Sequence, residues 1–238
     1  IRDMELSVKY ADELISLSQQ LGNDVYLHRG YLQKGNKKRM LGNLEEALDA
    51  YFKSADAAIK AKFTLGEGIV YSAIAEVYSI SDNHQNAMLY YHRAIDKLKQ
   101  TDNAISIGSA YLNAGDEFLN RKLFDSASYY FKAADPYFER ADYTIGKAYS
   151  LGNIGMINAN KGENSLAEKN LNKAITILEE KEDFYPICVY LISMSDIYLE
   201  KGDNKKALSY ALRSLQLAQQ YGLKEQISDA NLKLSELY

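Results

Sequence analysis

Cysteine, basic charge and long apolar runs are scarce in this chain, and each scarcity excludes a class of protein. The one cysteine among 238 residues, Cys188, excludes an internal disulfide framework, and its apolar neighbours predict a small core residue. The net charge of −4, with one short basic cluster at 34–39, argues against a nucleic-acid-binding surface. No apolar run is long enough to span a bilayer, so we expect no membrane contact by this segment.

Proline is also rare, with two residues in the chain. Pro186 falls where the repeat pattern described below places a turn between repeats. Pro136 falls late in an expected helix. It should end or kink that helix, because proline lacks an N–H group and its ring clashes with the preceding turn.

What the chain does have is an internal period. Alanine recurs at a constant interval, at Ala47, Ala87, Ala127, Ala167 and Ala207, so the period is 40 (87 − 47). Seven positions after each alanine stands a small residue, and four positions after it stands a residue that is mostly large and apolar. Self-similarity at a fixed period of this size is typical of a solenoid, in which each repeat packs on its neighbours.

Within each period, large and small residues recur three and four positions apart on both sides of a turn, which puts them on one face of a helix. The turn column lies five positions before each alanine and consists of Gly42, Asp82, Lys122, Gly162 and Gly202. Asn43, Asn83 and Asp203 follow it as predicted N-caps. A column of small residues that includes Gly35 and Gly155 lets two backbones approach closely. The unit is therefore predicted to be an antiparallel helical hairpin.

These columns resemble the tetratricopeptide repeat family. Segment 71–94 resembles it most closely, through Tyr71, Ile74, Ala75, Tyr78, Ala87, Tyr91 and Ala94. The unit is longer than the usual repeat of about 34 residues. With Leu21-Gly22 near its end, it is similar to the long-repeat subgroup of bacterial signalling proteins and kinesin light chains. The resemblance implies an all-α fold, a right-handed superhelix of antiparallel helical hairpins.

We expect residues 1–238 to form a single array of such repeats. Residues 1–21 are interpreted as the second helix of a truncated repeat, and 224–238 as the first helix of another. Five full repeats lie between them, at 24–62, 64–101, 104–141, 144–182 and 185–222. Terminal repeats normally carry a polar cap, and none is visible in the sequence. The chain is therefore interpreted as a fragment of a larger protein, with the alternative that its flanking helices cap the stack.

No catalytic, cofactor-binding or metal-binding constellation emerges, so we predict a protein that is not an enzyme and has no cofactor. His84 and His92 lie on one expected helix, but no further ligand completes a metal site. The segment 151–155, Leu-Gly-Asn-Ile-Gly, lacks the flanking strand that a dinucleotide fingerprint requires. Most of the 20 tyrosines occupy aromatic columns, whereas Tyr149 and Tyr190 are not readily explained by them.

In the tetratricopeptide repeat family, the first helix of each hairpin lines a concave face. Carried onto this sequence, the positions that flank the packing columns give a candidate groove of Arg29, Asn36, Glu76, Asn113, Asp116, Tyr149, Asn153, Met156, Asp196 and Glu236. The resemblance implies that Asn113 and Asn153 hold the backbone of an extended peptide, since a side-chain amide offers both donor and acceptor. A clamp for a carboxylate is not expected, because Leu32, Ala73 and Ser109 stand where such proteins carry lysine or arginine.

The groove predicts a partner that is a neutral or basic peptide or protein segment, or another domain of the same chain. By resemblance, the array is the sensory or regulatory part of a larger bacterial signalling protein, such as a histidine kinase, a nucleotide cyclase or a helix-turn-helix regulator. Two alternatives stay open: a scaffold that self-associates through uncapped ends, and a phosphatase-like regulator of response regulators. We expect the cytoplasm, with the periplasmic sensor region of a membrane-bound parent as the alternative.

Overall fold

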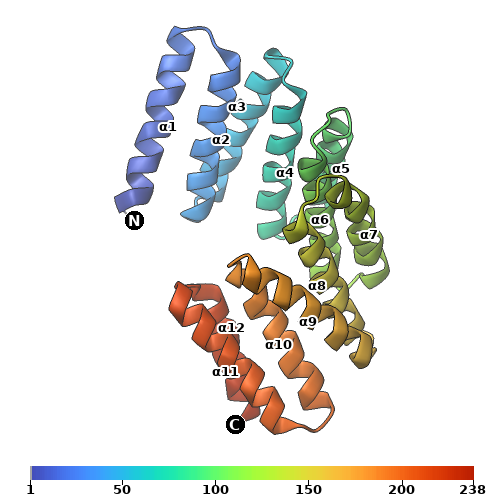
Figure 1. Ribbon diagram of the computed structural model, residues 1–238. Helices are drawn as coiled ribbons and strands as arrows, with labels where there is room; N and C mark the ends of the chain where they lie inside the picture. Colours follow the sequence, from blue (N-terminus) through green and yellow to red (C-terminus); the bar gives the residue numbers. More distant parts are fainter. Residues whose placement is uncertain (1) are drawn as a thin grey trace. The chain divides into compact units, whose positions relative to one another are not determined.

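The computed structural model describes the backbone of residues 2–238 and the side chains from Leu6 onward. These residues form twelve α-helices and no strand (Figure 1). The helices are α1 (Arg2–Gln20), α2 (Asp24–Met40), α3 (Leu44–Lys60), α4 (Thr64–Ile80), α5 (His84–Leu98), α6 (Ala104–Asn120), α7 (Phe124–Arg140), α8 (Thr144–Asn160), α9 (Asn164–Glu180), α10 (Phe184–Glu200), α11 (Asn204–Tyr221) and α12 (Lys224–Leu237). The predicted all-α fold of helical hairpins is confirmed. None of the helices in the described residues is both long and apolar enough to cross a membrane.

A residue in the left-handed conformation closes almost every turn. Positive φ angles recur at half the alanine period, at Gly22, Gly42, Lys62, Asp82, Lys122, Asp142, Gly162, Glu182, Gly202 and Gly222. At the first turn column the Gly42 N–H donates to the Arg39 carbonyl at 2.9 Å, and the Asn43 N–H donates to the Lys38 carbonyl at 2.9 Å. This pair of bonds is a Schellman motif, which satisfies the last carbonyls of a helix. The predicted turn column is confirmed, and each hairpin consists of two helix-turn units of equal length.

The seam inside each hairpin follows the predicted columns. All five alanines of the alanine column have an exposed fraction of 0%. A Cβ atom added at Gly35 would lie 2.4 Å from Cε1 of Tyr51, and one added at Gly155 would lie 2.9 Å from Cγ of Leu171. Both distances are shorter than an ordinary contact between carbon atoms, about 3.5–4.0 Å. The two helices of a hairpin therefore approach closely at the small column, as the sequence predicts.

Three local predictions need correction. Pro136 does not end α7, which continues to Arg140, and the alternative that it kinks the helix stays a prediction. Its ring is exposed near the end of the helix, where water can satisfy the carbonyl that loses its partner. Pro186 lies in the first turn of α10 rather than in the turn before it, because no intrahelical bond needs an N–H group there. Asn43 occupies an N-cap position, but its side chain makes no capping hydrogen bond, unlike Asn83 and Asp203.

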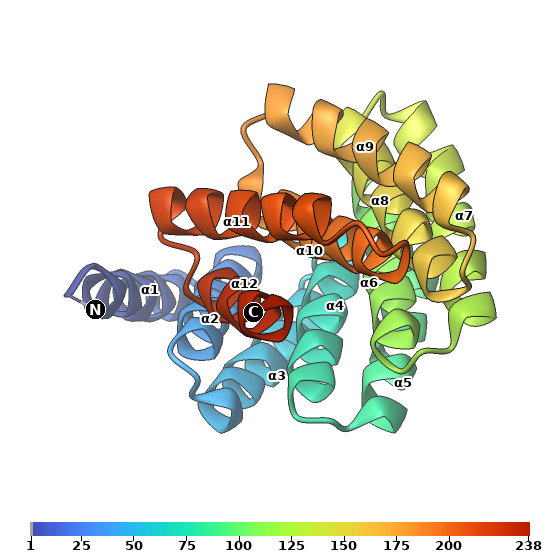
Figure 2. The same cartoon turned by 90° about the horizontal axis from the view of Figure 1, so that it is seen from below.

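The chain divides into two compact units, the residues up to Arg121 and the residues from Lys122 onward. In the first unit α2 pairs with α3 and α4 with α5, and in the second α8 pairs with α9 and α10 with α11. The first helices of successive hairpins also meet: α4 contacts α2 and α6, and α10 contacts α8 and α12 (Figure 2). Each unit therefore contains a row of three first helices, and this row positions the candidate site.

Candidate functional site

A cleft of about 410 Å³ lies in the second unit, lined mainly by the first helices α8, α10 and α12. Three of the ten predicted groove residues line it, namely Met156, Asp196 and Glu236. They are one full period apart, so each stands at the same register of its helix. Because α10 contacts both neighbouring first helices, one column of the sequence becomes a row of side chains across the face of the unit.

The walls of the cleft combine apolar and polar side chains. Val189 and Ile192 of α10 and Leu232 of α12 are among the apolar ones. Cys188, which is buried and free, also lines the cleft, and its thiol lies 3.7 Å from the Ser214 carbonyl oxygen. Burial raises the pKa of the Cys188 thiol, which keeps it protonated and unreactive. The prediction that Cys188 is a small core residue is confirmed.

Lys233 forms ion pairs with two of the acidic residues that line the cleft. The Nζ atom of Lys233 lies 2.7 Å from Oδ1 of Asp196 and also pairs with Glu236, which lies three positions along α12. Burial alone would lower the pKa of Lys233, but the hydrogen bonds to the two carboxylates outweigh burial and raise it. Lys233 is therefore charged at neutral pH. Asp229, one turn before Lys233, also lines the cleft and has no ion pair with any of the described residues.

A second, adjoining cleft of about 280 Å³ continues toward the carboxyl ends of α8 and α10. It shares Asn160, Ser193 and Asp196 with the first cleft and adds Glu200, the last residue of α10. The carboxyl end of a helix carries a partial negative charge. The two clefts thus adjoin each other, and their fixed charges favour a cationic ligand.

Tyr149 and Asn153, which sequence analysis assigned to the groove, do not line this cleft. The Tyr190 hydroxyl donates to Oδ1 of Asn153 at 2.9 Å and to the Tyr149 carbonyl oxygen at 3.3 Å. The Tyr149 hydroxyl in turn donates to Oδ2 of Asp183 at 2.5 Å. Tyr190 is 2% exposed, and its ring lies against Gly152. The two tyrosines outside the aromatic columns therefore belong to a hydrogen-bonded packing network between α8 and α10.

The first unit holds the other five predicted groove residues on α2, α4 and α6. Asn36 accepts a hydrogen bond from the Tyr51 hydroxyl at 2.8 Å, and Glu76 forms an ion pair with Arg39 at 3.0 Å. Asn113 and Asp116 are half-buried on α6. Arg29 is exposed, and its guanidinium carbon lies 5.5 Å from the centre of the Tyr26 ring, one turn earlier on the same helix.

Burial weakens the negative charge of this acidic column. It raises the pKa of Glu76, an effect that the nearby Arg39 partly reverses. It also raises the pKa of Asp116 to about 7. Near neutral pH Asp116 is therefore only partly ionised, and this face of the first unit carries less negative charge than its sequence indicates.

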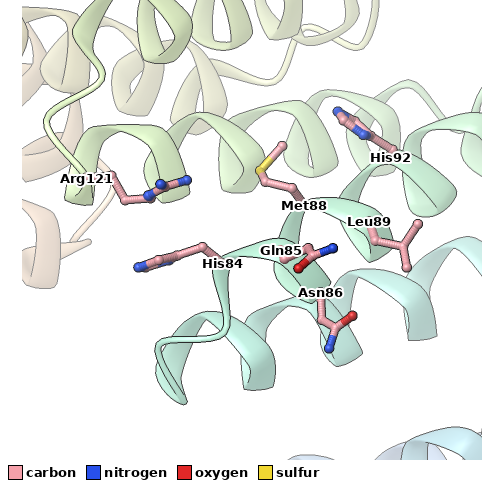
Figure 3. A pocket seen from close by; sticks show the side chains of 7 residues that line it. All are labelled: His84, Gln85, Asn86, Met88, Leu89, His92 and Arg121. Atoms are coloured by element: carbon pink, nitrogen blue, oxygen red, sulfur yellow. The ribbon is translucent and has the colours of Figure 1, made fainter.

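A separate cleft of about 490 Å³ lies on the second helix α5 of the first unit, next to Arg121 (Figure 3). It contains both histidines of that helix, but their rings lie apart, at opposite ends of the cleft. Nδ1 of His84 pairs with Glu117, and its Nε2 lies 3.2 Å from Asp82. Both ring nitrogens of His84 are thus engaged by carboxylates. From Leu6 onward, where side chains are described, no group of three histidine, cysteine or acidic side chains is arranged to hold a metal ion.

Gln226 also lines the α8–α10–α12 cleft, although it was not among the predicted groove residues. Its position in the period is occupied in the preceding repeats by Tyr26, Gly66, Ser106, Gly146 and Pro186. A long amide after four successive short residues in this column was a signal available in the sequence.

Two segments of the second unit, residues 148–178 and 190–221, match the tetratricopeptide repeat family model. They cover most of the α8/α9 and α10/α11 hairpins, which supply much of the cleft. No curated protein sequence matches the chain.

Several solved structures share the fold. The chain is similar to BtubC (BKLC) from P. vanneervenii, with a TM-score of 0.75, 16% identity and 92% of each chain covered. It is similar to aspartyl phosphate phosphatase F from Bacillus subtilis, with a TM-score of 0.73, 18% identity, and 95% of this chain and 60% of that chain covered. It is also similar to the Rap conjugation gene regulator of plasmid pLS20, solved in complex with the Phr* peptide, with a TM-score of 0.75, 18% identity, and 92% of this chain and 61% of that chain covered. The chain thus spans about three fifths of the length of the last two proteins.

Proposed function

Because the chain contains tetratricopeptide repeats, we propose that it is a non-catalytic module that binds a peptide or protein segment. The segment is neutral or basic and contacts the first helices α8, α10 and α12 of the second unit. The first helices α2, α4 and α6 of the first unit are a separate candidate surface. In the second unit the candidate contacts are Met156, Asp196 and Glu236, together with the other residues that line the α8–α10–α12 cleft. In the first unit they are Arg29, Asn36, Glu76, Asn113 and Asp116.

The cleft in the second unit carries this proposal. Met156, Asp196 and Glu236 come from three different helices and line one depression beside apolar side chains. A mixed wall of this kind suits a peptide, because apolar contact contributes affinity and a few placed polar groups fix orientation. The excess of carboxylates over lysine favours a basic partner and disfavours an acidic one.

The module is proposed to be the sensory or regulatory part of a larger bacterial signalling protein. This proposal is supported by the shared fold with the pLS20 regulator, which was solved with a peptide bound. Another domain of the same chain is an alternative occupant of the groove. The proposed compartment is the cytoplasm, where a buried free thiol such as Cys188 stays reduced.

Binding to arrays of immobilised peptides tests the proposal. We expect basic peptides to be retained, and Asp196→Asn to weaken their binding by about tenfold, the effect of losing one charge-assisted hydrogen bond. The double variant Asn113→Ala with Asn153→Ala tests the two predicted amides. Asp49→Asn is the matched control, because this exposed carboxylate on α3 also pairs with a lysine but lies outside the cleft. Failure of every peptide to bind, or equal loss in the control, would refute the proposal.

The name of the similar Bacillus subtilis protein favours one alternative, a regulator that dephosphorylates response regulators. Incubating the chain with phosphorylated receiver domains tests this alternative directly. Turnover above that of the buffer would overturn the proposal that this chain is non-catalytic.

Exposed apolar side chains favour a second alternative, self-association as a scaffold. Leu17 and Leu21 are 52% and 71% exposed, and Leu232 on α12 is 63% exposed. Light scattering over a range of concentrations distinguishes the alternatives, since a strict monomer removes the scaffold.

A further inference from the structure

The side chain of Gln226 is largely buried where it lines the α8–α10–α12 cleft. Gln226 is the third residue of α12 and is 4% exposed, yet it lines the α8–α10–α12 cleft. None of the described residues makes a hydrogen bond with this amide. Neither polar atom of the amide is among the fully buried side-chain atoms that lack a partner, so the amide reaches the open space of the cleft. Gln226 therefore presents one acceptor and two donors to whatever occupies the cleft.

Packing does not require a long side chain at this position. Four preceding repeats carry short residues at the corresponding position, although Tyr26 of the first repeat is long. Two of the four are glycines that lie directly against aromatic rings. A Cβ atom at Gly66 would lie 2.4 Å from Phe63, and one at Gly146 would lie 2.6 Å from Phe138. At Gln226 the structure instead accommodates a long polar side chain beside an open depression.

The charged groups around Gln226 favour a ligand with positive charge. Asp196, Asp229 and Glu236 supply three carboxylates, and Lys233 supplies one ammonium group. Lys233 is shared by Asp196 and Glu236, so the cleft retains an excess of two negative charges. The carboxyl ends of α8 and α10 at the adjoining cleft add to the same field.

We propose that this cleft holds the arginine side chain of a peptide, with the neighbouring apolar residue of that peptide against Ile192 and Leu232. A guanidinium group offers five N–H donors in a planar fork, which can reach carboxylates and an amide oxygen together. Lysine offers a point charge with three donors and matches this arrangement less well. The volume of about 410 Å³ lies toward the small end of ligand sites, roughly 300–1,000 Å³. This inference rests on the proposed peptide-binding function and names the residue that the peptide contributes.

The test uses the full chain, labelled with ¹⁵N, and N-acetyl-arginine methylamide as the probe. The side-chain amide signals of Gln226 are identified by their loss in Gln226→Met, a variant of similar shape without the amide. We expect the arginine probe to shift these signals saturably. The lysine analogue should bind more weakly, and the citrulline analogue, which is neutral, should bind about tenfold more weakly.

In Gln226→Met the affinity for the arginine probe should fall about tenfold, because the cleft loses the amide oxygen. The control Gln33→Met changes a glutamine that is exposed on the first helix α2, and it should leave the affinity unchanged. An unmoved Gln226 signal, or equal affinity for arginine and citrulline, would overturn the inference.

The two proposals fail in different ways. Array peptides that bind equally well to wild type and Gln226→Met would leave the peptide-binding function in place and overturn the arginine site. A response of Gln226 to the arginine probe without any binding peptide would support the site and overturn the function.

Discussion

Replacing Gly152 by alanine would put a methyl group in space that the Tyr190 ring occupies. The added Cβ would lie 2.2 Å from Cζ and 2.3 Å from Cε2 of that ring. A normal contact between carbon atoms is about 3.5 Å, so the ring would have to move by about 1 Å. The ring is 2% exposed, and its hydroxyl is held by Asn153 at 2.9 Å, so it has little room to move.

The expected cost follows from three contributions. Overpacking a core costs about 1–3 kcal/mol. Displacing the Tyr190 hydroxyl from Asn153 costs about 1 kcal/mol more. Alanine is favoured over glycine inside a helix by about 1 kcal/mol, which offsets part of this cost. We therefore expect Gly152→Ala to lower the free energy of unfolding by about 2 kcal/mol, and the melting temperature by roughly 4–8 °C for a chain of this size.

Urea unfolding followed by circular dichroism measures this change. Gly155→Ala is the matched control. It lies on the same helix, and its added Cβ would lie 2.9 Å from Cγ of Leu171. Because 2.9 Å is a smaller overlap than the 2.2 Å at Gly152, the gain in helix propensity should offset most of the cost, leaving a loss within about 1 kcal/mol.

A double-mutant cycle with Tyr190→Val isolates the contact. Removing the ring alone should destabilise by about 3 kcal/mol, because it leaves a cavity. In the Gly152→Ala background the same change should cost less by about 1–2 kcal/mol, since the methyl group then has room. A Gly152→Ala variant that is as stable as wild type, or additive effects in the cycle, would refute the view that Tyr190 is locked against Gly152.

Two further predictions concern charge and backbone. Burial raises the pKa of Asp116 to about 7, so its stabilising contribution is complete below the pKa of an unfolded aspartate, near 3.9, and is lost as the pH rises through about 7. Asp116→Asn should therefore unfold at the same urea concentration as wild type near pH 4. It should be more stable at pH 8 by about 2 kcal/mol, allowing for solvent screening of a half-buried group, and a difference that does not grow with pH would contradict this. Lys62 has a φ of 54° and Gly202 a φ of 74°. Thermal melts should show that Lys62→Gly raises stability by about 0.5–1 kcal/mol and that Gly202→Ala lowers it by about 1 kcal/mol. A loss of stability in Lys62→Gly together with a gain in Gly202→Ala would exclude turn strain as the cause.

The period of the sequence predicts the register of every helix, and register accounts for most of the fold. Because equivalent positions recur once in every period, Met156, Asp196 and Glu236 must fall on one face once their helices pack side by side. The turn column is equally predictable, since Gly42 and Gly202 mark a conformation that glycine adopts without strain.

The exceptions to the columns could not be predicted from the period. Tyr190 stands in a column of smaller residues and fills the space left by Gly152, where other repeats carry larger side chains such as Leu112. A large residue on α10 thus compensates for a small one on α8, and this compensation occurs at the interface between these two helices. It engages Asn153, which register alone assigned to the groove. Gln226 is a second departure from its column, and only the structure shows that it is buried beside a cleft.

A left-handed turn closes almost every helix, and these turns are half a period apart. A change of length that keeps the repeat register therefore adds or removes whole helix-turn units. Deleting one helix with its turn would reverse the direction of every later helix. It would also put second helices where first helices pack. Deleting two such units, which make one complete period, would keep first helices packed against first helices and would preserve the columns of equivalent positions. Duplication of an entire hairpin is thus the smallest change that lengthens the molecule without rebuilding its interior.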